Sequence, residues 1–207
     1  MHLLTLILGI TLLPRAHTLN CYECVPGTSG ACTDTAKECP LSGQLCGALR
    51  MTSYAGGSKV VDINSKSCAL KAECIEASVN FGISKTKINT NCCNSNLCNV
   101  KPAPEASESA PNGKKCFQCK GQDCTATLNC EGTEDHCIST TMNIGSESMT
   151  IKGCASKLIC LPETQQMSGI MGAKVNCCQG DYCNSASSTS AGLLLLVAPL
   201  VSVVVLS

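Results

Sequence analysis

The stretches "NCCNSNLCN" at Asn91–Asn99 and "NCCQGDYCN" at Asn176–Asn184 share one pattern: two adjacent cysteines, four spacer residues, a third cysteine and an asparagine. Two neighbouring cysteines rarely bond to each other, because the ring that would close is small and strained. Each of them must therefore find a partner elsewhere in the chain. A pattern of this kind that is used twice, 85 residues apart, indicates a repeated disulfide framework.

The composition agrees with such a framework. The 207-residue chain contains 20 cysteines, no tryptophan, two phenylalanines and three tyrosines. So few large side chains cannot fill a large core, and we expect small units that are held together by disulfides. The formal net charge is zero, which gives no basic field for a nucleic-acid partner and no acidic run for a polyelectrolyte.

The N-terminal region has the pattern of a secretory signal peptide over residues 1–18. An apolar run, "LLTLILGITLL" at residues 3–13, is followed by Ala16 and Thr18 at the −3 and −1 positions of a cleavage site. The run is too short to span a membrane. A buried apolar helix is the alternative, and the dense cysteines that follow at once argue against it.

The C-terminal region has the pattern of a glycosylphosphatidylinositol (GPI) anchor signal. The apolar stretch "LLLLVAPLVSVVVLS" at residues 193–207 follows the small and polar stretch "NSASSTSAG". We expect attachment at Asn184, with Ser185 as the alternative, and removal of residues 185–207. A transmembrane helix is disfavoured because 15 residues rise about 22 Å against a core of about 30 Å. The expected location is the cell surface, on the outer leaflet, with a secreted form possible, where cysteines meet an oxidising compartment.

Ten cysteines occur in each repeat. The first set is Cys21, Cys24, Cys32, Cys39, Cys46, Cys68, Cys74, Cys92, Cys93 and Cys98, and the second is Cys116, Cys119, Cys124, Cys130, Cys137, Cys154, Cys160, Cys177, Cys178 and Cys183. We place the domains at residues 19–99 and 114–184. The stretch between them, "VKPAPEASESAPNG" at residues 100–113, is expected to be an extended, solvated linker because of its prolines, small residues and glutamates.

Each repeat opens with C-x-x-C, which has two functional interpretations besides a disulfide. A zinc ribbon needs a second C-x-x-C at 15–20 residues, and a thioredoxin-like redox pair needs a βαβ pattern; neither is present. Past the signal peptide His136 is the only histidine, and the sequence has no G-x-S-x-G, no H-E-x-x-H and no phosphate-binding glycine loop. We therefore expect no enzyme, no metal and no cofactor.

The residues "LNCYEC", the ten-cysteine count, "CCNSNLCN" and "CCQGDYCN" resemble the lymphocyte antigen-6/urokinase-receptor (LU) family over nearly the whole mature chain. The resemblance implies an all-β, disulfide-rich fold with two tandem three-finger domains, in which Asn99 and Asn184 bond to the backbone of the hub. It also implies a disulfide pairing that spacing alone leaves open. The implied pairs are Cys21–Cys46, Cys24–Cys32, Cys39–Cys68, Cys74–Cys92, Cys93–Cys98, Cys116–Cys137, Cys119–Cys124, Cys130–Cys154, Cys160–Cys177 and Cys178–Cys183.

The local sequence supports hairpins for some of the fingers. "ALRMTSY", "AGGS" and "KVVDIN" predict a hairpin that turns at Gly56 and Gly57. "CISTTMNI", "GSES" and "MTIKGC" predict a second hairpin around Gly145, with one sheet face formed by Met142, Ile144, Met149 and Ile151. "ASVNFGI" and "TKINTN" predict a strand pair around Ser84, whereas "LPETQQMSGIMGAKVN" is weak strand sequence.

The function expected from these observations is a GPI-anchored cell-surface binding protein, a receptor or modulator that recognises an extracellular protein through its fingers. Tyr54, Lys59 and Phe81 are the candidate contact residues, although packing within the domain is the alternative for each; Tyr22 is expected to be structural. Relatives of the urokinase-receptor type have three such domains, the first of which lacks the seventh–eighth pair, whereas both domains here have all ten cysteines. Their ligand is therefore not transferred to this chain.

Two alternatives stay open. "CVPGTSGACTDTAKECPLSGQLCG" and "NCEGTEDHCIST" resemble the two-domain gamma-type phospholipase inhibitors, so the chain could be a soluble or surface inhibitor of a secreted phospholipase. The C-terminal tail weighs against this role because those inhibitors lack an anchor. Cell adhesion through the paired domains is the other alternative.

Overall fold

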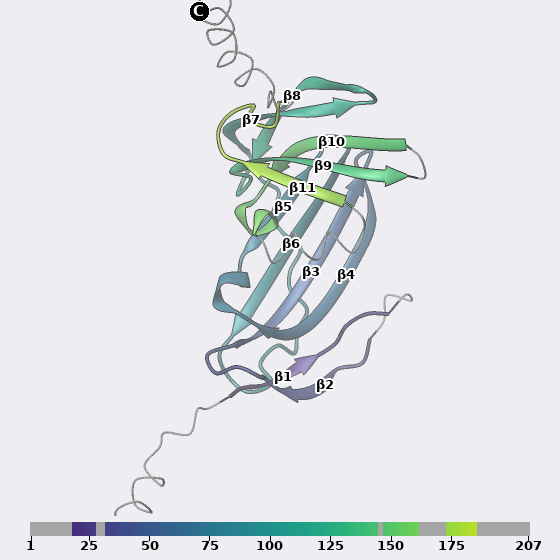
Figure 1. The fold of residues 1–207 in the computed structure, drawn as a ribbon. Coiled ribbons are helices and arrows are strands. Elements are labelled where there is room, and N and C mark those ends of the chain that lie inside the picture. Colours follow the sequence, from purple (N-terminus) through teal and green to yellow (C-terminus); the bar gives the residue numbers. More distant parts are fainter. Residues whose placement is uncertain (1–17, 28–31, 145–146, 162–172, 186–207) are drawn as a thin grey trace, which may run out of the picture. The chain divides into compact units, whose positions relative to one another are not determined.

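A computed structural model describes residues 18–27, 32–144, 147–161 and 173–185 (Figure 1). The expected signal peptide core at residues 3–13 and the apolar tail at residues 193–207 lie outside these ranges, as do Gly145 and most of "LPETQQMSGIMGAKVN". The regular structure of the described residues consists of strands and two short 3-10 turns, so the predicted all-β, disulfide-rich class is confirmed. The elements are β1 (Asn20–Glu23), β2 (Thr35–Glu38), β3 (Leu45–Ala55), β4 (Ser58–Ala69), η1 (Lys71–Glu73), β5 (Glu76–Asn80), β6 (Ser84–Cys93), β7 (Pro111–Lys120), β8 (Asp123–Glu131), β9 (His136–Ile144), β10 (Glu147–Ala155), η2 (Lys157–Cys160) and β11 (Ala173–Cys178).

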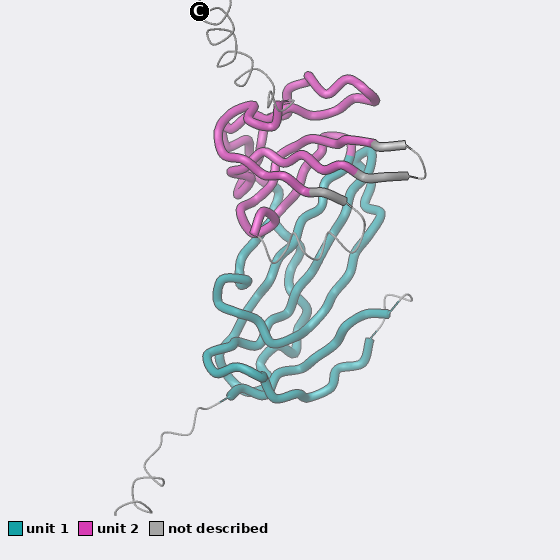
Figure 2. Tube along the Cα trace, in the orientation of Figure 1, with its two compact units in different colours: residues 1–77, 84–108 teal, residues 78–83, 109–207 magenta. Residues whose placement is uncertain are grey.

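The chain forms two compact units, which Figure 2 distinguishes by colour. The first unit contains residues 1–77 and 84–108, and the second contains residues 78–83 and 109–207. These units differ from the sequence repeats in two places. The segment 78–83 of the first repeat groups with the second unit, and residues 100–108 group with the first unit.

Five disulfides lie within each unit, and these ten bonds use all 20 cysteines. They join Cys21 to Cys46, Cys24 to Cys32, Cys39 to Cys68, Cys74 to Cys92, Cys93 to Cys98, Cys116 to Cys137, Cys119 to Cys124, Cys130 to Cys154, Cys160 to Cys177 and Cys178 to Cys183. These are the pairs that the family resemblance implies. Half-cystines also form the buried cluster at the centre of each unit, so disulfides take the place of the aromatic core that the composition lacks.

An asparagine closes the hub of the first unit. The Asn99 side chain accepts a hydrogen bond from the Tyr22 N–H at 2.9 Å and donates to the Tyr22 and Gly47 carbonyls, each at 2.9 Å. The residue is 3% exposed. One buried side chain thus joins the first finger, the second finger and the terminal ring, because an amide has both donors and an acceptor.

The second unit repeats this arrangement with Asn184. Its side chain accepts from the Phe117 N–H at 2.9 Å and donates to the Phe117 and Ile138 carbonyls, each at 3.0 Å. The terminal rings match as well, because Leu97 and Tyr182 both have left-handed backbone, with φ of 54° and 57°. The N–H of Leu97 bonds to the Asn20 carbonyl at 2.6 Å, and that of Tyr182 bonds to the Lys115 carbonyl at 2.8 Å.

The first unit carries its fingers as β-hairpins. Strand β1 pairs with β2, and β3 pairs with both β4 and β6, all antiparallel. The β3–β4 hairpin turns at Gly56 and Gly57, as predicted, and both residues have positive φ, 56° and 81°. A two-residue turn with positive φ at both positions matches the twist of the strands, which explains why glycines are found there.

The second unit has the same arrangement of strands. Strand β7 pairs with β8, and β9 lies between β10 and β11, all antiparallel. The register pairs Met149 with Met142 and Ile151 with Thr140, so the four predicted positions share one face of the β9–β10 hairpin. The weak strand sequence before Cys177 forms β11 over its last residues, Ala173–Cys178.

Residues 100–113, which we expected to form an extended, solvated linker, are mostly exposed, but several of them contact the rest of the chain. Ala103 is 2% exposed, and the Asn89 side-chain amide donates to the Pro104 carbonyl at 3.0 Å. Strand β7 begins at Pro111, within the expected linker. A proline-rich extended chain leaves its carbonyls free, and here neighbouring side chains use them as acceptors.

Candidate functional site

One face of the β4–β3–β6 sheet in the first unit carries a cluster of charged side chains. Arg50 makes a bidentate contact with Asp62, with Nε–Oδ1 and Nη2–Oδ2 distances of 2.9 and 2.7 Å. Lys59 lies 3.4 Å from Asp62 and 2.7 Å from Glu105. The Tyr54 hydroxyl donates to the other oxygen of Glu105. The β3–β4 hairpin thus holds a carboxylate that comes from the segment after the first repeat.

Two further contacts hold the same segment to the sheet. The Lys87 ammonium lies 2.7 Å from the Glu108 carboxylate and 3.3 Å from the Ser107 carbonyl. It also lies 5.8 Å from the centre of the Tyr54 ring. Since Lys87 is 4% exposed, the pairing satisfies a lysine that would otherwise be costly to bury.

The chain is also held at the point where it leaves the first hub. The Lys66 ammonium donates to the Val100 carbonyl at 2.6 Å and to the Asp34 carboxylate at 2.6 Å. It lies 5.8 Å from the centre of the Tyr22 ring. Residues 100–108 are therefore bound along the sheet from the hub to Glu108, and we call them the strap.

The ion pairs of this face alter the acidity of its carboxylates. The hydrogen bonds from Arg50 lower the pKa of Asp62 to about 2, and Lys59 adds to the effect. The bond from Lys59, followed by that from Tyr54, lowers the pKa of Glu105. Lys87 lowers the pKa of Glu108. All three groups are therefore held in the charged form at neutral pH.

The structure engages two of the three candidate contact residues within the chain itself. Tyr54 and Lys59 both bind Glu105, so neither is a free tip residue. Phe81 is half-buried and belongs to the second unit, where a Cβ on Gly153 would lie 2.0 Å from the Asn80 carbonyl oxygen and 3.0 Å from the Phe81 Cα. Tyr54 and Lys59 thus have partners within the chain, and contact of any of the three with a partner protein stays a prediction.

Sequence reasoning missed the residues that hold the strap. Arg50 and Asp62 carry opposite charges at near-opposite positions of the predicted hairpin, which is a usable signal. Glu105 and Glu108 gave none, because a glutamate in a proline-rich stretch is typical of solvated chain.

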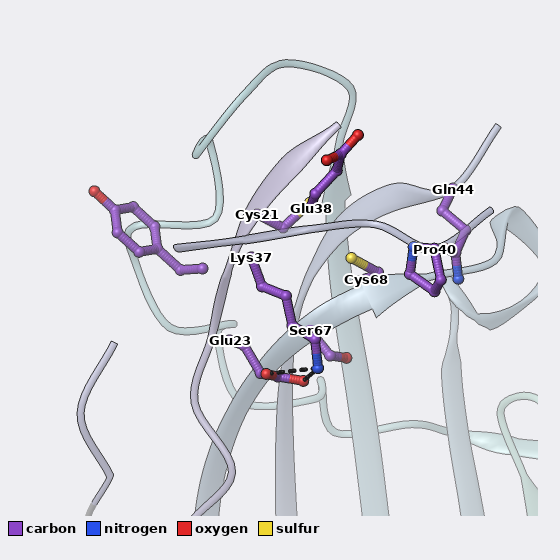
Figure 3. A pocket seen from close by; sticks show the side chains of 9 residues that line it. Cys21, Glu23, Lys37, Glu38, Pro40, Gln44, Ser67 and Cys68 are labelled. Atoms are coloured by element: carbon purple, nitrogen blue, oxygen red, sulfur yellow. Dashed lines mark hydrogen bonds and ion pairs between the residues drawn. The ribbon is translucent and has the colours of Figure 1, made fainter. Parts of the chain in front are cut away.

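A cavity of about 380 Å³ lies beside the first hub (Figure 3). The Lys37 ammonium and the Glu23 carboxylate, 2.8 Å apart, pair with each other at its edge. Tyr22 also lines it, and the backbone of this residue holds Asn99, in agreement with a structural role. Since the charges of this pair already neutralise each other, they offer little to an ionic ligand.

His136 and the cysteines are the residues for which the sequence analysis considered catalysis or metal binding. His136 bonds to the adjacent Asp135 carboxylate at 2.8 Å, with no hydroxyl or thiol nucleophile in that contact. The two sulfur clusters, Cys21–Cys39–Cys68 and Cys116–Cys130–Cys154, consist of disulfide-bonded cysteines, which cannot act as thiolate ligands. Within the described ranges, no helix has the length and apolar character needed to cross a membrane.

Comparison with known proteins gives two family matches. Residues 17–101 match the u-PAR/Ly-6 domain, and residues 115–184 match the snake toxin and toxin-like protein family. The chain is 31% identical to lymphocyte antigen 6E of Gallus gallus over 101 residues, which cover 47% of this chain and 74% of that protein.

Two longer relatives are also similar. The urokinase plasminogen activator surface receptor of Mus musculus is 30% identical over 105 residues, covering 45% of this chain and 32% of the receptor. A gamma-type phospholipase A2 inhibitor of Elaphe climacophora is 33% identical over 79 residues, covering 34% of this chain and 40% of the inhibitor. The match thus spans about a third of the receptor's length and two fifths of the inhibitor's.

Proposed function

Since the chain belongs to the u-PAR/Ly-6 family of non-enzymatic binding proteins, we propose that it is a GPI-anchored cell-surface protein that presents three-finger domains to an extracellular protein partner. The observation that carries the proposal is the pair of disulfide hubs, each closed by a buried asparagine. Such hubs hold fingers in place without a large core and leave strand faces and finger tips for recognition. A relative whose name describes a surface receptor supports the same role.

The anchor rests on the C-terminal sequence pattern: small residues, a polar spacer and an apolar tail. We propose Ser185 as the attachment residue in preference to Asn184. Asn184 is 5% exposed and its side chain is fully engaged in the hub, whereas Ser185 is exposed at the end of the domain. An enzyme that exchanges a peptide bond for the anchor needs an accessible residue, and Ser185 is the more accessible of the two.

Release by phosphatidylinositol-specific phospholipase C from cells that express the full chain tests the anchor. We expect the surface signal to fall and the protein to appear in the medium. Mass spectrometry of the C-terminal peptide then identifies the attachment residue. Protein that stays on the cell after treatment, although a known GPI-anchored protein on the same cells is released, would contradict the anchor and favour a spanning tail.

The binding surface is proposed to lie outside the strap-covered face of the first unit. The strap already occupies Tyr54 and Lys59 there, so a partner would have to displace several ion pairs to reach them. The tip of the β3–β4 hairpin at residues 55–58 is exposed, and Val60 on β4 is 60% exposed. Cross-linking on cells that bind this protein tests the assignment. A photoreactive residue at position 60 should cross-link to the partner, whereas one at position 54 should not.

Inhibition of a secreted phospholipase is the second candidate, and the similarity to a gamma-type phospholipase A2 inhibitor favours it. The test is the activity of secreted phospholipase A2 on vesicles in the presence of the released protein. A dose-dependent loss of hydrolysis would support inhibition, and unchanged hydrolysis at a large excess would remove it.

A further inference from the structure

The β10–β9–β11 sheet of the second unit has a polar face on which three side chains form one row. The register pairs Lys152 of β10 with Ser139 of β9, and Ser139 with Asn176 of β11. Thr150 and Thr141 form the next row on the same face, and their hydroxyls are 3.1 Å apart. These five side chains line an open cavity of about 600 Å³ that extends to Ser185.

The side chains of the first row have no hydrogen-bond or ion-pair partner among the described residues. Lys152 is nevertheless only 8% exposed, and its ammonium lies 6.0 Å from the centre of the Phe117 ring. A lysine that is largely removed from water without a counter-charge is costly. Among the described residues no acidic side chain lines the cavity, so an anion that entered it would meet one positive charge and no negative one.

The lysine at the equivalent position of the first repeat, Lys66, has partners in the structure. Lys66 and Lys152 both lie two residues before the sixth cysteine, and both lie over the aromatic residue that follows the first cysteine. Lys66 binds the Asp34 carboxylate and the carbonyl of Val100, the residue after the hub asparagine. Asp34 lies five residues before the fourth cysteine, and in the second repeat this place is taken by Thr125, which carries no charge.

The residue that corresponds to Val100 in the second repeat is Ser185, because each directly follows the hub asparagine. In the first unit the strap continues from Val100 along the sheet. In the second unit the equivalent path starts at Ser185, at the rim of the cavity, where we have placed the lipid anchor. A phosphoethanolamine-linked glycan that starts at Ser185 would therefore be within reach of Lys152.

We propose that this cavity binds a phosphate- or sulfate-bearing sugar, and that its source is the glycan of the chain's own anchor. The Lys152 ammonium supplies the charge for the oxyanion, in the place where Lys66 holds the Asp34 carboxylate. The hydroxyls of Ser139, Thr141 and Thr150 and the amide of Asn176 suit sugar hydroxyls. The source, although not the chemistry of the site, depends on the anchor proposed above.

The first experiment uses the full chain, released from cells by phosphatidylinositol-specific phospholipase C. Half of the sample is treated with aqueous hydrogen fluoride, which cleaves the phosphodiester and removes the glycan while leaving the ethanolamine. Hydrogen exchange is then measured in β9 and β10. We expect the treatment to speed exchange at residues 139–141 and 150–152 several-fold in the wild-type protein.

Two variants at the site make this effect specific. In Lys152→Met the treatment should change nothing, because the oxyanion has lost its counter-charge. In Thr125→Asp a carboxylate stands where Asp34 stands in the first repeat, and it should compete with the glycan and reduce the effect. Lys157→Met, which removes an exposed lysine of the same unit, is the control and should behave like the wild type.

The second experiment uses the treated protein and titrates it with mannose 6-phosphate, a sulfated disaccharide and uncharged mannose. Binding of a charged sugar that Lys152→Met abolishes and Lys152→Arg retains would support the site. If such binding is found but hydrogen fluoride treatment does not change the exchange rates, the ligand is a free sugar and not the glycan of the anchor. If the lipase releases no protein, the anchor fails, and the same titration on detergent-extracted protein still tests the site. Equal exchange before and after treatment, together with no binding of either charged sugar, would overturn the proposal.

Discussion

The two repeats have matching hubs but treat the same sheet face differently. Asn99 and Asn184 share three equivalent hydrogen bonds to the hub backbone, to which Asn184 adds one to the Gly153 carbonyl, and Leu97 and Tyr182 have the same left-handed backbone. In the first unit the strap covers the face through side chains of three strands. In the second unit the described part of that face is a polar row that leaves Lys152 without a counter-charge.

This difference shows which part of the repeat is constant and which part differs between the two copies: the hub is constant, and the strand face differs. The hub fixes the fold, because disulfides and the hydrogen bonds of one buried asparagine join the strands at the base of the fingers. The strand face then depends on the segment that follows the hub asparagine, which is the strap after Asn99 and the proposed anchor signal after Asn184. The following predictions test the shared hub first and then the differing faces.

The largest effect is expected from the hub asparagines. Asn99→Ala removes three hydrogen bonds to the hub backbone and Asn184→Ala removes four, and each leaves backbone groups unpaired. Each change should therefore lower the free energy of unfolding of its own unit by about 3 kcal/mol. Guanidinium unfolding of the disulfide-intact protein measures the loss. Substitution of the exposed Asn94 is a control for position in the ring. If the two substitutions lower the free energy of unfolding by clearly different amounts, the two hubs are not energetically equivalent.

The strap contact through Glu105 comes next. Glu105→Gln removes the charge that Lys59 and Tyr54 bind, so the strap should open more often. We expect proteinase K to cleave within residues 101–108 about tenfold faster. Glu76→Gln, at an exposed glutamate of the same repeat, is the control and should leave the rate unchanged. Equal rates for both variants would show that Glu105 does not hold the strap.

The third prediction concerns acid. The folded pKa of Asp62, about 2, lies below the unfolded value of about 3.9, so its contribution is fully present above about pH 4 and is lost as the pH falls towards 2. Since Asp62 is 32% exposed, screening reduces this contribution to about 1 kcal/mol. The difference in unfolding free energy between the wild type and Asp62→Asn should therefore be constant from pH 7 to 5 and approach zero near pH 2. A difference that persists at pH 2 would contradict the assignment.

The smallest effect is expected in the terminal rings. Tyr182 packs on Phe117 with ring centres 5.0 Å apart, whereas the aliphatic Leu97 stands at this place in the first ring. Tyr182→Leu makes the second ring resemble the first and should cost about 0.5–1 kcal/mol, since it removes an aromatic pair. Leu97→Met is the matched change in the first ring and should be close to neutral. Thermal unfolding followed by circular dichroism measures both.

The sequence predicts what depends on local chemistry. The Gly56–Gly57 hairpin follows from a turn type that needs positive φ, and the disulfide pairs follow from the family resemblance. The strap could not be predicted, because part of its contacts use backbone carbonyls such as that of Pro104, which any residue could supply, and its glutamates lie in sequence that is typical of solvated chain. The Lys152 row also does not follow, because it needs the register of three strands, and β11 comes from sequence with weak strand preference.

The place of each hub asparagine at the end of its repeat has a consequence for the order of folding during synthesis. The bonds of Asn99 close the first hub, and all ten of its cysteines precede this residue, so its hub disulfides can form while the second repeat is still emerging. The second hub must wait for Asn184, the residue directly before the proposed attachment point. With the proposed anchor, completion of the second hub and transfer of the chain to a lipid would involve the same few residues, and a cell that attached the anchor early would leave that hub to close on the membrane.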